Sequence, residues 1–152
     1  MSITHRISAE LYYDSFELIG VHSALEDYAL AYALNSNLGI YLKRAQKDLS
    51  LDVYPSFPIF EWESEITETN LVLIRNSCSR EEQSVGLFMK EPSLTTHYLI
   101  EERKEVDYFL KIESEEPSTT EKLLDTINAM DHIITAYVVD IQNLKTRQNL
   151  IF

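Results

Sequence analysis

The chain has 152 residues, of which 45% are hydrophobic and 25% are charged, and this balance is typical of an ordinary globular domain. The formal net charge is −12 at pH 7. Such acidity argues against nucleic acid and anionic membranes as partners, because both require clustered cations. We therefore expect one domain over residues 1–152, with no nucleic-acid or membrane partner.

The cysteine content and the N-terminal residues indicate the cellular compartment of the protein. Cys78 is the single cysteine, so the chain cannot form an intrachain disulfide or a cysteine-based metal site. Residues 1–14 lack the apolar core of a signal peptide. We expect a cytoplasmic protein.

The first elements are a strand and a helix. Residues 16–21 are compact and apolar and predict a strand. Ser23 and Glu26 have the spacing of a capping box, and residues 35–39 predict the end of the helix that follows. The predicted buried stripe of this helix comprises Leu25, Tyr28, Ala29, Tyr32 and Ala33. Residues 40–51 have a mixed pattern, which does not decide between a short strand and a loop.

The middle of the chain predicts mainly strands. Residues 57–63 and 70–75 form a predicted hairpin. Pro58 lacks an amide donor and favours an edge or the first residues of a strand. Residues 77–82 are expected to be a mobile loop, and residues 85–89 are a candidate strand.

The last third begins with a second predicted hairpin. Residues 97–101 and 106–112 have strand patterns and flank the charged turn 102–105. Ser118 and Glu121 then repeat the capping-box spacing at the start of a second helix. The predicted buried stripe of that helix comprises Leu123, Leu124, Ile127 and Met130.

The order of these elements predicts the fold class. A β-branched run over residues 133–141 is expected to close the sheet. Successive strands with few crossover helices predict an α+β fold, a mostly antiparallel sheet of about six strands with two helices packed on one face. The other face is then solvated, curled or buried against a partner. The 9 Tyr and 6 Phe favour a partner, and we expect a homodimer that buries aromatic sheet surface.

One segment resembles a known family. Residues 100–108 read IEERKEVDY, which is similar to the signature I-P-E-x-x-x-V-D-Y of the IPExxxVDY family of uncharacterised bacterial proteins. The matching residues are Ile100, Glu102, Val106, Asp107 and Tyr108, and Glu101 stands where the family has proline. Residues 16–23, 26–35 and 149–152 also resemble that family. The resemblance implies a bacterial cytoplasmic protein without an assigned activity, and Glu101 restores an amide that could pair across the predicted hairpin.

The signature supports two interpretations. Glu102 and Asp107 could present carboxylates to a divalent cation, with Glu105 as a third oxygen donor. Alternatively, the apolar signature residues face the core and the charged ones face solvent. No calcium-loop spacing accompanies the signature, so we assign no metal site.

A second candidate site lies between the first strand and the first helix. Its residues are His22, Ser23, Glu26 and Asp27. Free amides there could bind an anion or ligand, and His22 could act as an acid or base. Against this, the capping box already uses Ser23 and Glu26, and two acids would repel a phosphate. Nucleotide-loop, serine-hydrolase and zinc-histidine motifs are missing from the sequence, so we predict no catalytic residue and no cofactor.

The apolar end of the chain is a candidate interface. Leu150, Ile151 and Phe152 must dock either on the core of the same chain or in a second subunit, since free apolar ends are unfavourable in water.

Together these observations favour a noncatalytic domain that binds a protein or a ligand, or acts as an adaptor. The alternative is a small metal-dependent or acid–base enzyme that uses Glu102, Asp107 and His22. This alternative requires the three side chains to meet in one pocket.

Overall fold

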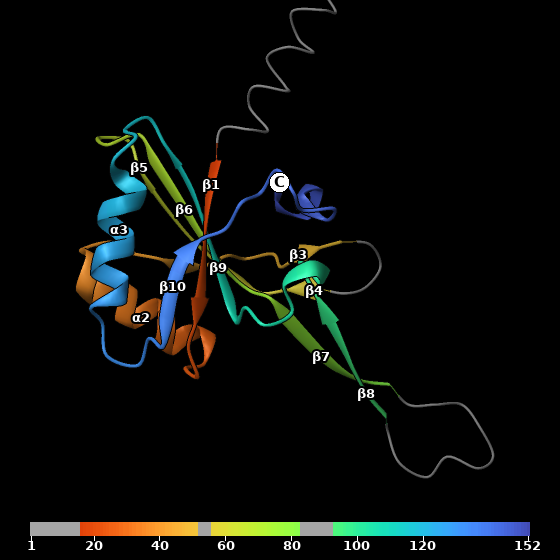
Figure 1. The fold of residues 1–152 in the computed structure, drawn as a ribbon. Helices are drawn as coiled ribbons and strands as arrows, with labels where there is room; N and C mark the ends of the chain where they lie inside the picture. Colours follow the sequence, from red (N-terminus) through yellow and green to blue (C-terminus); the bar gives the residue numbers. More distant parts are fainter. Residues whose placement is uncertain (1–15, 52–55, 83–92) are drawn as a thin grey trace, which may run out of the picture.

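The computed structural model describes residues 16–51, 56–82 and 93–152. These residues form a main sheet of six antiparallel strands in the order β10-β1-β9-β6-β5-β2. Helices α2 and α3 lie together on one side of this sheet (Figure 1). The predicted α+β fold class is therefore confirmed.

The strands and helices have the following bounds. The main sheet contains β1 (Phe16–His22), β2 (Lys43–Arg44), β5 (Ile59–Ser64), β6 (Thr69–Arg75), β9 (Tyr108–Ser114) and β10 (Thr135–Val138). Two small sheets pair β3 (Leu49–Ser50) with β4 (Ser56–Phe57), and β7 (Ser77–Glu82) with β8 (Ser93–Tyr98). The helices are α2 (Asp27–Leu38) and α3 (Thr119–Asn128), and two 3₁₀ turns are η1 (Glu101–Arg103) and η2 (Arg147–Leu150). Within the described residues, no helix has the length and apolarity that crossing a membrane would require.

Side chains alternate along the strands, so the central strands contribute to a core on each face of the sheet. On the helix side, Val21 and Leu110 belong to one buried cluster together with Leu30, Leu34 and Ile127 of the helices. The inner stripe of α2 therefore differs from the prediction. Tyr28 and Tyr32 are exposed, because the larger aliphatic side chains of the same helix occupy the core instead.

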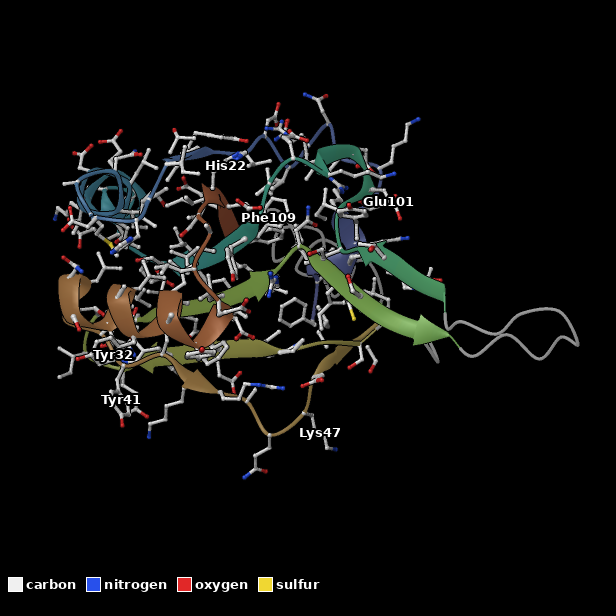
Figure 2. All side chains as sticks on the ribbon, turned by 90° about the horizontal axis from the view of Figure 1, so that it is seen from below. His22, Tyr32, Tyr41, Lys47, Glu101 and Phe109 are labelled. Carbon is white, nitrogen blue, oxygen red and sulfur yellow. The ribbon has the colours of Figure 1, made fainter. Side chains whose placement is uncertain are left out.

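The opposite face of the sheet is covered by the chain itself. Leu18 and Phe109 belong to a second buried cluster with Ile100, Val106 and Leu150 from the last third of the chain. Figure 2 shows Phe109 inside the molecule, and its exposed fraction is 0%. The prediction that this aromatic sheet surface waits for a second subunit is therefore wrong.

The predicted hairpin over residues 97–112 does not form. Strand β8 pairs with β7, and the two extend away from the main sheet, whereas β9 lies between β1 and β6 (Figure 1). Residues 77–82, predicted as a mobile loop, are strand β7. Since Glu101 begins the turn η1, its amide has no opposite strand to pair with. The candidate strand 85–89 lies outside the described residues.

Other element boundaries also differ from the prediction. Pro58 divides the predicted strand 57–63, since β4 ends before it and β5 begins after it. The closing strand is shorter than the predicted 133–141 and covers Thr135–Val138. Helix α2 ends as predicted, with Gly39 at φ 66°, a left-handed conformation that glycine adopts without strain.

Neither predicted capping box forms. The N-cap residue of α2 is Glu26, which caps no amide with its side chain. The Ser23 hydroxyl instead donates to the carbonyl of His132 at 2.8 Å. Ser118 occupies the N-cap position of α3, but its hydroxyl donates to Glu116 at 2.8 Å. The Ser23 hydroxyl is thus used by a tertiary contact and the Ser118 hydroxyl by a local one, and neither caps its helix.

Candidate functional site

The signature segment takes its path from Asn76, a fully buried residue directly after β6. Its Oδ1 accepts a hydrogen bond from the amide of Ile100 at 2.9 Å. Its Nδ2 donates to the carbonyls of Arg103 at 2.7 Å and Val106 at 3.0 Å. Its backbone N–H donates to the carbonyl of Asp107 at 2.9 Å. A buried amide whose hydrogen-bonding groups are satisfied holds its partners in one arrangement, so Asn76 holds the loop that joins β8 to β9.

The two signature carboxylates point to different parts of the molecule. Glu102 accepts hydrogen bonds from the Thr146 hydroxyl at 2.9 Å and from the Thr146 amide at 3.2 Å. Asp107 accepts the Ser23 amide at 2.9 Å. Burial tends to raise the pKa of Glu102, but the hydrogen bonds from Thr146 outweigh it and the pKa is lowered. The two carboxylates thus fasten the C-terminal segment and the β1–α2 connection rather than facing a common cation.

Metal ligands do not gather in the described part of the chain. Glu105, the third oxygen donor considered for a cation, pairs with Arg103 at 2.7 Å. Over residues 16–51, 56–82 and 93–152, no group of three or more His, Cys, Asp or Glu side chains could hold a metal ion.

A polar pocket of about 270 Å³ lies beside the signature segment. Its lining residues are Ser23, Ala24, Arg75, Ser77, Thr96, Tyr98, Lys104, Val106, Asp107 and Tyr108, and we call it the signature pocket. They come from the β1–α2 connection, the end of β6, the β7–β8 ribbon and the signature itself. The fold thereby brings together both candidate sites of the sequence, since Ser23 and Asp107 are 84 residues apart along the chain.

Arg75 and Tyr108 form one wall of the signature pocket. The Arg75 guanidinium donates to Glu26 at 3.0 Å and lies 5.8 Å from the ring centroid of Tyr108. Burial alone would lower the pKa of Arg75, but Tyr108, Glu26 and Asp27 outweigh it and raise the pKa, so the cation persists. Burial also raises the pKa of Tyr108 to about 12, and its neutral hydroxyl donates to the carbonyl of Leu25 at 2.5 Å.

Lys104 supplies the second cation of the pocket. Its ammonium lies 3.6 Å from a carboxylate oxygen of Glu101 and 5.4 Å from the ring centroid of Tyr98. Both partners of this ion pair are more than half exposed. Exposed pairs of this kind contribute about 0 to 1 kcal/mol, so an anionic ligand can displace the glutamate at little cost.

His22 belongs to a different cluster. Its Nε2 lies 2.9 Å from the hydroxyl of Tyr137, which also accepts a hydrogen bond from Arg103 at 3.2 Å. His22 does not line the signature pocket, and neither does Glu102; Asp107 does. The enzyme alternative required His22, Glu102 and Asp107 to meet in one pocket, and these three side chains do not.

The remaining members of the β1–α2 candidate site have separate positions. Ser23 lines the signature pocket, and Glu26 adjoins it through Arg75. Asp27 is the first residue of α2, where its carboxylate accepts the amide of Tyr28 at 2.7 Å. The structure thus places one residue of this candidate site in the pocket wall and a second beside it.

The apolar C-terminal residues pack on the sheet of the same chain. Leu150 is fully buried in the second cluster and Ile151 packs against it. The Phe152 ring centroid lies 4.4 Å from the ammonium of Lys111, a buried lysine that also pairs with Glu113 at 3.2 Å. The sequence left two docking sites open for these residues, the core of the same chain and a second subunit. The structure shows the first of these.

Sequence reasoning missed two residues. Arg75 forms part of the pocket wall, and Asn76 holds the signature segment in place. A weak signal was available, because this polar pair ends the apolar strand Thr69–Arg75 and begins the next segment. Polar residues at the end of a buried strand are favourable positions for a site.

We compared the chain with protein-family models, curated proteins and solved structures, and none of the three comparisons found a match.

Proposed function

We propose that this protein is a noncatalytic binding domain of the IPExxxVDY family, acting in the bacterial cytoplasm as a homodimer, and that its signature pocket holds a small polar ligand. The observation that carries the proposal is the pocket itself. Its wall combines Val106, Asp107 and Tyr108 of the signature with the cations Arg75 and Lys104.

The backbone at the start of the signature supports family membership. Ile100 has φ −117° and ψ 98°, an extended conformation close to the one that a residue before proline favours. Glu101 is the first residue of η1, and proline is favoured at the first position of a helix. The family's proline would therefore fit where this chain has glutamate.

The chemistry of the pocket indicates the class of ligand. Arg75 and Lys104 are suited to a carboxylate, which arginine binds in a bidentate manner. Asp107 is suited to an amino or hydroxyl group on the same ligand. The volume of about 270 Å³ is below the common range for drug-sized ligands, about 300 to 1,000 Å³. We therefore propose an amino-acid-sized molecule that carries a carboxylate and an amino or hydroxyl group.

A titration followed by NMR tests the ligand proposal. Glutamate, serine and citrate are added separately to ¹⁵N-labelled protein, and the amide shifts of Ser23, Ser77 and Asp107 are followed. We expect at least one probe to shift these three amides in a saturable manner. If none of the probes shifts them, the proposed ligand class is wrong.

A matched pair of lysine variants locates the binding. Lys104→Gln removes a pocket cation and is expected to weaken binding about tenfold, the effect of losing roughly 1.4 kcal/mol. Lys122→Gln removes another exposed lysine, which pairs with Glu116 at 3.1 Å outside the signature pocket, and it should leave the affinity unchanged. Equal affinities of the two variants would exclude the signature pocket as the site.

A protein partner is the second mode of binding in this proposal. It is supported by Tyr28, Tyr32 and Tyr41, which are large exposed side chains outside the signature pocket.

A further inference from the structure

A second cavity, of about 220 Å³, lies at the N-terminal turn of α3. Its walls come from three parts of the chain: the α2–β2 connection, the β5–β6 hairpin and the first turns of α3. The start of α3 and the β5–β6 turn lie together at one end of the molecule (Figure 1). The lining residues differ from those of the signature pocket. We call this second cavity the α3 cavity.

The interior of the α3 cavity is mainly apolar. Ile40, Trp62, Leu71 and Leu123 contribute to its walls. Trp62 and Leu71 are register partners on β5 and β6, so their side chains lie on the same face of the sheet. Leu71 is a buried member of the core cluster on the helix side, and the other three are partly buried against that cluster. These walls favour an apolar group, because its entry removes apolar surface from water.

The mouth of the α3 cavity carries one positive and one negative charge. Lys122 and Glu116 both line the cavity, and their side chains are 70% and 60% exposed. The Lys122 ammonium lies 3.1 Å from Oε1 of Glu116, and the Ser118 hydroxyl donates to the same oxygen at 2.8 Å. The hydrogen bonds from Ser118 and Lys122 lower the pKa of Glu116, so its carboxylate is ionised at neutral pH.

This ion pair keeps capacity for further hydrogen bonds. Both bonds to the Glu116 carboxylate go to Oε1, so Oε2 remains an acceptor. An ammonium offers three donors, and Lys122 uses one of them on Glu116. Pairs between exposed side chains are weakly held. A ligand can therefore bring a positive group to Glu116 and a negative group to Lys122 at little cost.

We propose that the α3 cavity is a second ligand site, which binds a free α-amino acid with an aromatic or large aliphatic side chain. The apolar side chain enters beside Trp62 and Leu123, the ammonium binds Glu116 and the carboxylate binds Lys122. This site lies outside the signature pocket and goes beyond the proposed function. Its volume of about 220 Å³ is below the range of about 300 to 1,000 Å³ for drug-sized ligands, and it suits a molecule as small as an amino acid.

The charges at the mouth select this ligand class over related ones. An apolar acid without an amino group meets Lys122 favourably but is repelled by Glu116. An apolar amine without a carboxylate is repelled by Lys122. An α-amino acid answers both charges, because its two charged groups are attached to one carbon atom, as the paired charges of Lys122 and Glu116 are adjacent at 3.1 Å.

Fluorescence of Trp62 tests the proposal directly, because Trp62 is the single tryptophan of the chain and lines the cavity. Phenylalanine is added to the protein, and we expect a saturable change in the emission. N-acetylphenylalanine lacks the ammonium and phenethylamine lacks the carboxylate, so each should bind at least about tenfold more weakly. The absence of a saturable change with phenylalanine would overturn the proposal. Equal affinities for the three compounds would show a site for any aromatic ring and would overturn it too.

A matched pair of variants locates the binding. Lys122→Gln removes the cation at the mouth of the α3 cavity and should weaken phenylalanine binding about tenfold. Lys104→Gln changes the signature pocket and should leave phenylalanine binding unchanged. Equal affinities of the two variants would exclude the α3 cavity as the site. The two variants have the reverse roles in the titration of the signature pocket, so failure of one ligand proposal is distinguishable from failure of the other.

A third variant tests the role assigned to Glu116. Glu116→Gln removes the negative charge at the mouth, and the preference for phenylalanine over N-acetylphenylalanine should then disappear. Circular dichroism checks that the variant is folded, as expected for a change at an exposed side chain. A preference that persists in Glu116→Gln would overturn the placement of the ligand ammonium at this residue.

Discussion

Asn35, Asn76 and Asn128 each use the side-chain amide to bind backbone groups of another segment. A primary amide offers a donor and an acceptor as a peptide group does, so it can take the place of a missing strand or turn. Asn35 holds Leu42 beside α2, and Asn128 binds the edge strand at Ala136. At the residue scale, three polar side chains therefore join the elements of this fold.

Asn76 should be the most sensitive of these positions. Asn76→Ala would leave the Ile100 amide and the Val106 carbonyl unpaired in the core, and each such group costs about 1 to 3 kcal/mol. We expect a loss of about 3 kcal/mol in the free energy of unfolding, measured with urea. Asn35→Ala is the control, because Asn35 is half-buried and water can replace its two bonds, so about 1 kcal/mol is expected. Similar losses for both variants would contradict the proposed role of Asn76.

Tyr108 should make stability depend on pH in the alkaline range. Its pKa is raised from 10.0 to about 12 in the folded protein, so the unfolded chain loses the phenol proton first. The contribution of Tyr108 is complete below pH 10 and is lost as the pH rises toward 12. We expect the urea midpoint of the wild-type chain to fall more steeply over this interval than that of Tyr108→Phe. Parallel curves for the two proteins would show that burial does not shift this group.

At the scale of elements, the main sheet ends at the short strand β10, which pairs with β1 on one side. An open edge of this kind can recruit another chain. Here Asn128 at the end of α3 donates to the Ala136 carbonyl at 3.0 Å and accepts the Ala136 amide at 2.9 Å. The helix thereby closes part of the edge and keeps β10 attached to the sheet.

Loss of this contact should be visible by hydrogen exchange. In Asn128→Ala the Ala136 amide loses its acceptor, and we expect it to exchange at least about tenfold faster, equivalent to roughly 1.4 kcal/mol of protection. Asn37→Ala is the control, since Asn37 bonds within its own helix to Ala33. Unchanged protection of Ala136 in Asn128→Ala would mean that solvent exclusion, and not the side-chain amide, protects the edge.

At the scale of the whole molecule, the sheet is covered on both faces. Helices α2 and α3 cover one face, and the signature segment with the C-terminal residues covers the other (Figure 1). Glu102 connects these two parts of the second cover through Thr146, and Asn149 donates to the Leu99 carbonyl at 2.8 Å. The end of the chain is therefore a structural layer and not an appendage.

Leu150→Ala tests the importance of that layer. Leu150 has an exposed fraction of 0%, and truncation of a buried leucine to alanine costs about 2 to 5 kcal/mol. We expect a loss in this range from thermal or urea unfolding. Ile66→Ala should change stability by less than about 0.5 kcal/mol, because that side chain is exposed. A Leu150→Ala loss below about 1 kcal/mol would show that the C-terminal residues are a dispensable cover.

Local patterns predicted many elements correctly. The strands Ile59–Ser64 and Thr69–Arg75 and the stop of α2 at Gly39 follow from alternation and from glycine's tolerance of positive φ. The predicted buried stripe of this helix was right for Leu25 and Ala33, which pack against the core, and wrong for Tyr28 and Tyr32, which are exposed. Spacing alone could not select the inner side, because large nonpolar or aromatic side chains occur on both sides of α2.

The sequence by itself determined the fold class and marked two segments as candidate sites, because hydrophobic periodicity and residue type are local properties. Tertiary structure alone decided that β8 pairs with β7, that the signature begins with a 3₁₀ turn, and that Ser23 meets Asp107 at one pocket with Arg75. These features depend on contacts between residues far apart along the chain, and a local pattern carries no information about which distant partner a strand or a buried amide will find.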